Sequence, residues 1–191
     1  YAPFLTDEID PWTLYDADKG RTHTFGGISF PGNGSAFAYT VFNCDGTTHG
    51  MDDATTQLFK QRFAGHNSDQ AMMSFGNLGD AASGNEDWII SPELSGKAQT
   101  IAFWEKSFKG SDKETYNLMY STSGFNRSDF TALEMNHIVS DKWTEVEYNL
   151  PEGTKYFAVV ASSTDGFATL IDDISFIPDS CAAQQLTLIG Y

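Results

Sequence analysis

The sequence predicts an all-β fold in which short antiparallel strands form a sandwich or a barrel. Turn-forming segments recur about every ten residues, from Asp18-Lys-Gly20 to Asp165-Gly166, and this spacing is typical of short strands joined by tight turns. The 191 residues include 15 Phe, 8 Tyr and 4 Trp, and aromatic side chains favour strands over helices. A chain of this length can bury a substantial core as one domain.

Period-two alternation locates the strands. The clearest runs from Thr144 to Leu150, where inward positions alternate with Glu145, Glu147 and Asn149. Residues 155–162 are apolar on both faces, and the turn 151–154 predicts a hairpin that joins these two strands. Further strands are expected at 70–75, 87–91, 100–106, 116–122 and 170–177.

One segment departs from this pattern. Leu58 and Arg62, like Phe59 and Phe63, are four residues apart, which is the spacing of neighbours on a helix face. At most one short helix is therefore expected, near 52–63, with an aspartate as its N-cap.

The net charge limits the partners. The chain has 26 acidic and 11 basic residues, a formal charge of −15, which would repel nucleic acid and anionic membranes. Without a run of 18 apolar residues, no membrane insertion is expected. The two cysteines, Cys44 and Cys181, exclude a disulfide-rich scaffold and leave a single bridge open. The chain begins at Tyr1 without a methionine, which suggests a processed piece of a longer protein.

The sequence predicts no catalysis. It contains no HExxH, GxSxG, P-loop or GxGxxG motif, and its four histidines are scattered. A glycosidase on this kind of scaffold needs two carboxyls facing each other across a cleft. Glu145 and Glu147 share a face, but the alternation places that face in solvent.

Two acidic segments are candidates for a metal site. Asp172 and Asp173 interrupt an apolar strand, so one should point inward. A buried carboxylate needs a partner, and Ca²⁺ prefers oxygen ligands. The alternative is a position at the sheet rim with hydrogen bonds from backbone amides. Asp16-Ala-Asp18-Lys-Gly20 is similar to the start of a calcium loop, or else forms Asx-type turns.

Aromatic side chains admit two interpretations as well. Residues 31–69 form a long irregular segment whose Phe37, Tyr39, Phe42 and His49 are candidates for a ligand-binding surface, because functional loops are carried on rigid sheets. The alternative is that these rings cover the sheet edge. Three tryptophans in or beside expected strands, Trp88, Trp104 and Trp143, are expected in the core or half-buried.

An ordered series of motifs resembles the cleaved-adhesin, or choice-of-anchor J, domain family. It opens with Trp12-Thr-Leu-Tyr-Asp-Ala-Asp18 and continues with Glu86-Asp-Trp-Ile-Ile-Ser-Pro-Glu-Leu94 and Ile101-Ala-Phe-Trp104. Leu150-Pro-Glu-Gly-Thr-Lys-Tyr-Phe157 and Leu170-Ile-Asp-Asp-Ile174 complete it. The series keeps its order across residues 12–177, nearly the whole chain.

The resemblance implies a jelly-roll β-sandwich, galactose-binding-like or MAM-like, over 1–178, followed by a tail at 179–191 that joins a fibronectin-like domain. It also implies structural Ca²⁺ held by acids that correspond to Asp16, Asp18, Asp87, Asp172 and Asp173. Lys19 and Arg21 replace the acidic continuation of the opening loop, which puts a calcium ion there in question.

Three functions follow as hypotheses. The first is a non-catalytic adhesion module, secreted or on a cell surface, that binds a glycan or glycoprotein. The second is an accessory spacer domain attached to a hydrolase or peptidase. The third is a jelly-roll glycoside hydrolase. A concave face with exposed rings would favour the first, a smooth polar surface the second, and two carboxyls facing one another in a cleft the third.

Overall fold

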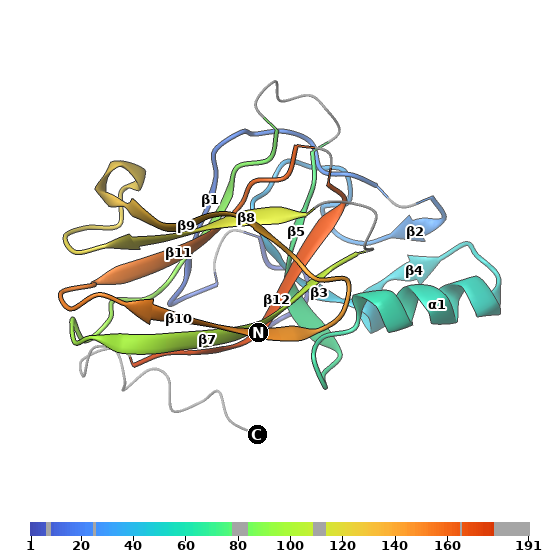
Figure 1. Cartoon of the computed structure of the whole chain (residues 1–191). Helices are drawn as coiled ribbons and strands as arrows, with labels where there is room; N and C mark the ends of the chain where they lie inside the picture. The colour runs from blue at the N-terminus through green and yellow to red at the C-terminus, as the bar shows by residue number, and fades with distance from the viewer. Residues whose placement is uncertain (7–8, 25, 78–83, 109–113, 165, 178–191) are drawn as a thin grey trace.

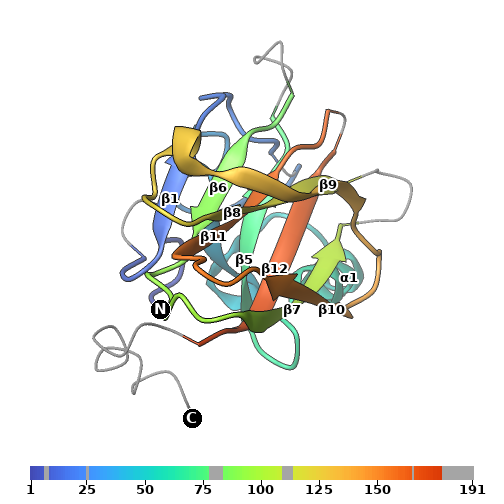
Figure 2. The same ribbon diagram turned by 60° about the vertical axis from the view of Figure 1, so that its left-hand side comes forward.

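The fold is a sandwich of two five-stranded antiparallel sheets. The computed structural model describes residues 1–6, 9–24, 26–77, 84–108, 114–164 and 166–177. The first sheet contains, in spatial order, β1 (Thr13–Asp16), β6 (Asp87–Ile90), β11 (Tyr156–Ala161), β8 (Thr115–Ser121) and β9 (Thr131–Ile138). The second contains β10 (Thr144–Leu150), β7 (Gln99–Ser107), β12 (Ala168–Ser175), β5 (Gln70–Phe75) and β3 (Thr40–Asn43). Figures 1 and 2 show the two layers.

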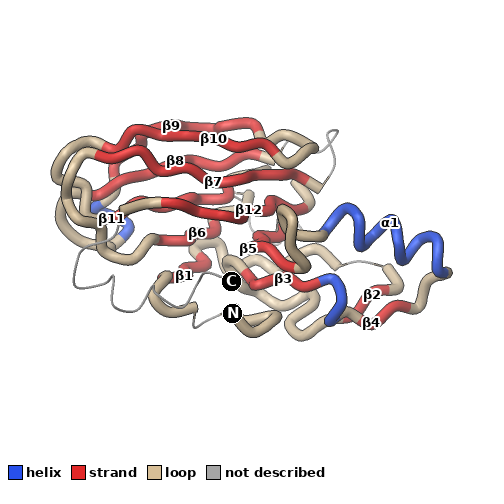
Figure 3. Tube along the Cα trace, turned by 90° about the horizontal axis from the view of Figure 1, so that it is seen from below, coloured by secondary structure: helices blue, strands red, loops and turns tan. Residues whose placement is uncertain are grey.

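A small lateral unit packs beside the second sheet. It consists of the helix α1 (Asp53–Phe63) and the ribbon of β2 (Ile28–Ser29) and β4 (Thr48–His49), which lie beside the long strands in Figure 3. Asp52 caps the helix by accepting a hydrogen bond from the Thr55 amide at 2.9 Å. Two short 3₁₀ helices, Cys44–Gly46 and Arg127–Asp129, complete the elements. In the described part of the chain, no helix is long and apolar enough to cross a bilayer.

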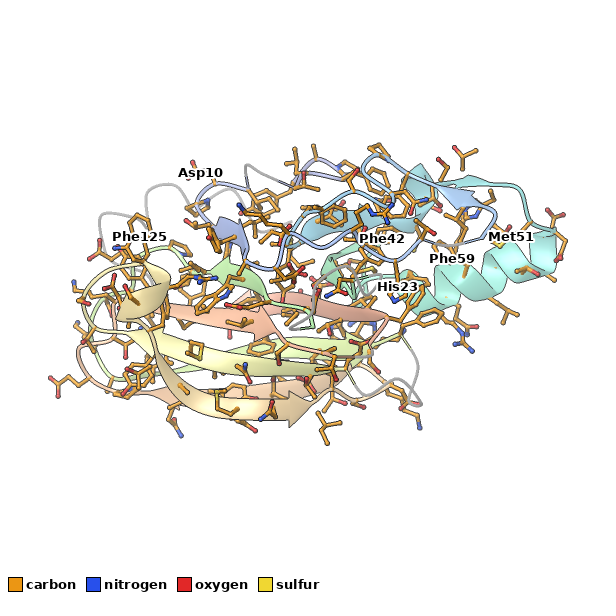
Figure 4. All side chains as sticks on the ribbon, turned by 90° about the horizontal axis from the view of Figure 1, so that it is seen from above. Asp10, His23, Phe42, Met51, Phe59 and Phe125 are labelled. Carbon is orange, nitrogen blue, oxygen red and sulfur yellow. The ribbon has the colours of Figure 1, made fainter. Side chains whose placement is uncertain are left out.

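Two apolar cores lie on opposite faces of the second sheet. The core between the sheets includes Phe103, Tyr116 and Phe157. The second core lies between that sheet and α1, where Phe42 packs against Phe59 and Phe63 at ring-centroid distances of 6.2 and 5.8 Å. Figure 4 shows Phe42 near Phe59, which lies on α1. The helix forms here because burying its phenylalanine face stabilises it more than its weak local preferences do.

The structure confirms the all-β sandwich and corrects one connection. Strands β5 and β10 have the predicted bounds, and α1 lies within 52–63. The expected hairpin of β10 and β11 is wrong, because β10 pairs with β7 in the second sheet and β11 lies in the first. The turn 151–154 therefore crosses between the sheets. The expected tail at 179–191 lies outside the described residues.

Candidate functional site

Three carboxylates meet where β1 ends and β6 begins. Asp16 and Asp87 are directly paired across these antiparallel strands, so their side chains share a face. Asp18 follows two residues after Asp16, and ligand oxygens of all three lie within 4.8 Å of one another. The structure thus brings together three of the five predicted metal ligands.

Tight turns hold this acidic cluster in place. One carboxylate oxygen of Asp18 accepts a hydrogen bond from the Gly20 backbone amide, and the other accepts one from the Glu86 backbone amide, both at 2.6 Å. The Asp16 carboxylate accepts the Lys19 amide at 2.6 Å. A Cβ on Gly20 would lie 2.6 Å from Asp18 Oδ1, so only glycine fits that position. The loop therefore has the Asx-type turns expected as one alternative, and it also points its acids at Asp87.

Asp87 is the most buried member of the cluster. Its side chain is 2 % exposed and accepts hydrogen bonds from the Ser74 hydroxyl at 2.7 Å and the Asn85 amide at 2.8 Å. Burial raises the pKa of Asp87 well above its usual value, and the charges of Asp18 and Asp16 raise it further. Burial also raises the pKa of Asp16.

The donor set fits a hard divalent cation. Three carboxylates supply oxygen ligands only, which Ca²⁺ prefers. Among the residues described, no Lys, Arg or His side chain lies within 4.0 Å of these acids. Such a group keeps its full negative charge at low cost only with a cation, because buried like charges repel one another strongly.

The remaining predicted ligands, Asp172 and Asp173, lie apart from this cluster on β12. A register shift follows Asp172, and Asp173 has a φ of 48°, so the strict inward and outward alternation fails here. The Asp172 carboxylate accepts hydrogen bonds from the backbone amides of His66 and Asp173, each at 2.9 Å. The Asp173 carboxylate lies 2.8 Å from Nδ1 of the His66 ring. These partners match the rim position given as the alternative.

The rings predicted to bind a ligand are in the core instead. Phe37, Tyr39 and Phe42 are buried, and a side chain without exposed surface offers nothing to a ligand. His49 is half-buried, bonds to the Thr47 hydroxyl at 2.8 Å and packs edge-on against Phe59. The predicted surface at Phe37, Tyr39 and Phe42 is therefore wrong, because Phe37 and Phe42 are buried in the core that includes α1 and Tyr39 is buried in the core between the sheets.

An aromatic and cationic surface lies on the outer face of β7 beside α1. The His66 ring stacks on Trp104 with centroids 3.7 Å apart and lies 5.8 Å from Trp143. The Lys106 ammonium lies 5.8 Å from the Trp143 ring centroid. We call Arg62, His66, Trp104, Lys106 and Trp143 the Trp143 platform. All five side chains are half-buried or exposed.

The sequence contained only part of the signal for this surface. Trp104 and Lys106 are two residues apart on a strand, so they share a face. The contributions of Trp143, His66 and α1 depend on tertiary contacts that periodicity does not reveal. Glu145 and Glu147 on β10 are exposed, as the alternation predicts.

A second buried carboxylate was missed altogether. Glu105, 2 % exposed, accepts a hydrogen bond from the His137 Nε2 at 2.9 Å, and Glu134 contacts the other ring nitrogen at 3.1 Å. Burial alone would lower the pKa of His137, but Glu105 and Glu134 outweigh it and raise the pKa. The Tyr148 hydroxyl, 3.4 Å from the ring, bonds to the Tyr116 hydroxyl at 2.7 Å. This group joins β9 to the second sheet.

The two packed antiparallel sheets place the chain among jelly-roll β-sandwich domains. A family model described as the Cleaved Adhesin Domain matches residues 29–176, and the chain belongs to this family.

Solved structures of the family have the same fold. The K1 cleaved adhesin domain of Lys-gingipain from Porphyromonas gingivalis W83 aligns with a TM-score of 0.61 and 22% identity, over 94% of this chain and 97% of that one. The K3 domain of the same protein aligns with a TM-score of 0.54 and 23% identity, over 91% and 97%. A search of curated proteins gave no match.

Proposed function

We propose that this domain is a non-catalytic glycan-binding adhesion module of a larger secreted or cell-surface protein. Membership of the cleaved-adhesin family supports adhesion as the general role. The observation that carries glycan binding is the Trp143 platform, where aromatic rings and hydrogen-bonding groups lie together on the outside of a rigid sheet.

The chemistry of this surface suits a sugar. Rings offer apolar faces to the C–H groups of a pyranose, and nearby polar side chains bind its hydroxyls. The platform provides the Trp143 ring and the stacked pair of His66 and Trp104, in which each ring covers one face of the other, with Glu145 paired opposite Trp104 in the sheet. Trp104 lies on β7 and Trp143 directly precedes β10, so the sheet restricts both rings before the ligand arrives.

Calcium is the second part of the proposal. Ca²⁺ would be held by Asp16, Asp18 and Asp87, where it would offset the mutual repulsion of the three acids and join β1 to β6. Its role is structural, because the cluster lies on the first sheet and the platform on the second.

A glycan array tests the binding function. The intact domain is expected to bind a subset of glycans at micromolar strength, and Trp143→Ala is expected to weaken binding at least tenfold. Tyr15→Ala is the matched control, because it removes a 44 % exposed ring from the other sheet. Uniform silence of the array would instead support the spacer domain.

A further inference from the structure

We propose that the ligand of the Trp143 platform is an anionic sugar, whose carboxylate or sulfate is bound by Lys106 and Arg62. The inference rests on the proposed glycan binding and adds the chemical class of the glycan. It follows from the two positive charges beside the rings, since a neutral sugar would need only the rings and hydrogen-bonding groups.

Lys106 and Arg62 lie next to each other at the end of α1. The Lys106 ammonium donates a hydrogen bond to the backbone carbonyl of Arg62 at 2.8 Å. Each cation also lies over a ring, Lys106 at 5.8 Å from the Trp143 centroid and Arg62 at 5.5 Å from that of Phe108. Two like charges are therefore held side by side against aromatic surface.

Neither cation has a carboxylate within ion-pair distance among the described residues. Elsewhere in the same acidic surface, Lys60 contacts Asp45, Arg127 contacts Glu86 and Lys155 contacts Glu93. Burial lowers the pKa of Lys106 and the charge of Arg62 lowers it further. A bound anion would relieve both effects, and it would complement two charges that form no ion pair with the described residues.

The platform also has a polarity that would orient its ligand. Asp173 contacts His66, and the exposed Glu145 pairs with Trp104 in the sheet, so these two acids lie beside the rings, while the charge of Asp141 acts on Lys106 without an ion pair. A sugar could place its hydroxyls toward these acids and its anionic group toward Lys106 and Arg62. An acidic peptide would match the cations but has no pyranose face for the rings, so we favour a glycan.

The other exposed aromatic surface provides a matched control. Arg127 lies over the Tyr15 ring at 5.1 Å, but it is paired with Glu86, which also accepts the Trp88 indole hydrogen at 3.1 Å. Its polar groups therefore satisfy one another, and no unneutralised charge is left for an anion.

Isothermal titration with defined oligosaccharides tests the inference. The probes are sialyllactose, a chondroitin sulfate tetrasaccharide, their neutral counterparts lactose and desulfated, carboxyl-reduced chondroitin, and a sulfated tyrosine peptide. At least one anionic sugar is expected to bind ten times more tightly than its neutral counterpart; sialyllactose tests a carboxylate alone, and chondroitin sulfate tests a carboxylate together with sulfate. Lys106→Gln and Arg62→Gln are each expected to reduce that affinity at least tenfold, and Arg127→Gln less than twofold.

Melting curves establish that each variant is folded, and Arg62→Gln changes an exposed side chain that leaves the core intact. Equal binding of neutral and anionic sugars, unaffected by Lys106→Gln, would overturn the inference and leave glycan binding standing. A tenfold loss in Arg127→Gln would assign the ligand to the other surface. Tight binding of the peptide would overturn the glycan assignment, and silence of every sugar would overturn glycan binding itself.

Discussion

Two carboxylates in this sandwich are equally buried and are neutralised differently. Glu105 and Asp87 are each 2 % exposed. Glu105 has a basic partner, His137, at 2.9 Å, whereas Asp87 lies with two further acids and, within the described part of the chain, accepts side-chain hydrogen bonds from neutral groups only. In a chain with a charge of −15, one acid is thus stabilised by a cation of the protein, and for the other cluster we propose a cation from solution.

Both sites should make the folded protein less stable as pH rises, but for different reasons. Raised pKa values at Asp87 and Asp16 mean that the folded protein binds extra protons, so without calcium its stability falls as pH rises above about 4. The proposed Ca²⁺ would bind the ionised acids, so in saturating Ca²⁺ the stability should no longer fall in this pH range. Ca²⁺ should not change the pH dependence that comes from His137, because the groups that raise its pKa are the side chains of Glu105 and Glu134.

The largest effect is expected from removing the cation beside Glu105. His137→Ala leaves a buried carboxylate without its partner, which should lower the free energy of unfolding by about 3–5 kcal/mol. Urea unfolding measures the change. Adding Glu105→Gln to His137→Ala should recover much of the loss, because the amide carries no charge. A loss below about 1 kcal/mol, at the level of an exposed ion pair, would mean that Glu105 is solvated and that the comparison fails.

Removing calcium should have the next largest effect. At a calcium concentration 100 times the Kd, binding stabilises the fold by about 2.7 kcal/mol. For a chain of this size, EDTA should then lower the melting temperature by about 5–10 °C, and excess Ca²⁺ should restore it.

Asp87→Asn is the control for the calcium effect. This variant should lose the response to Ca²⁺, and in EDTA it should be at least as stable as the parent because one buried charge is gone. Identical melting curves of the parent protein with EDTA and with Ca²⁺ would remove calcium from the proposal.

The titration of His137 should be visible as a smaller change with pH. A raised folded pKa contributes stability that is fully present below about pH 6.5 and is lost as pH rises through the folded value. A pKa difference of one corresponds to about 1.4 kcal/mol. Urea midpoints measured in saturating Ca²⁺ between pH 5 and 9 should decline for the parent protein, and the decline should be absent in His137→Gln.

The smallest effect concerns the hydroxyl pair beside His137. Tyr148→Phe removes the partner of the buried Tyr116 hydroxyl and should cost about 1 kcal/mol. Thermal unfolding measures it, with Tyr120→Phe as a control on the same sandwich. A loss as large as that of His137→Ala would show that the hydroxyls, rather than the ion pair, hold this edge together.

The strands could be predicted from sequence, because each depends on its own alternation. The pairing of the strands could not be predicted in the same way. Residues 144–150 and 156–161 have strong local patterns, yet they lie in different sheets. A short turn permits either a hairpin or a crossing, and only the packing of the whole chain decides between them.

The candidate sites show the same difference between local patterns, which the sequence reveals, and contacts between strands, which it does not. Asp16, Asp18 and Asp87 were grouped through family resemblance, and the register of β1 with β6 supplies the geometric reason. Phe42 was misplaced because an aromatic residue in an irregular segment has the same local pattern whether a helix covers it or not. His137 was missed because its contact with Glu105 joins strands of different sheets.

Strand β12 has one further consequence for how the domain unfolds. Ala168 and Leu170 belong to the core under α1, while Ile171 between the sheets belongs to the other core. Loss of β12 would therefore open both cores in the same event. The lateral unit and the sandwich should behave as one cooperative folding unit, in which loosening around α1 is transmitted directly to the centre of the molecule.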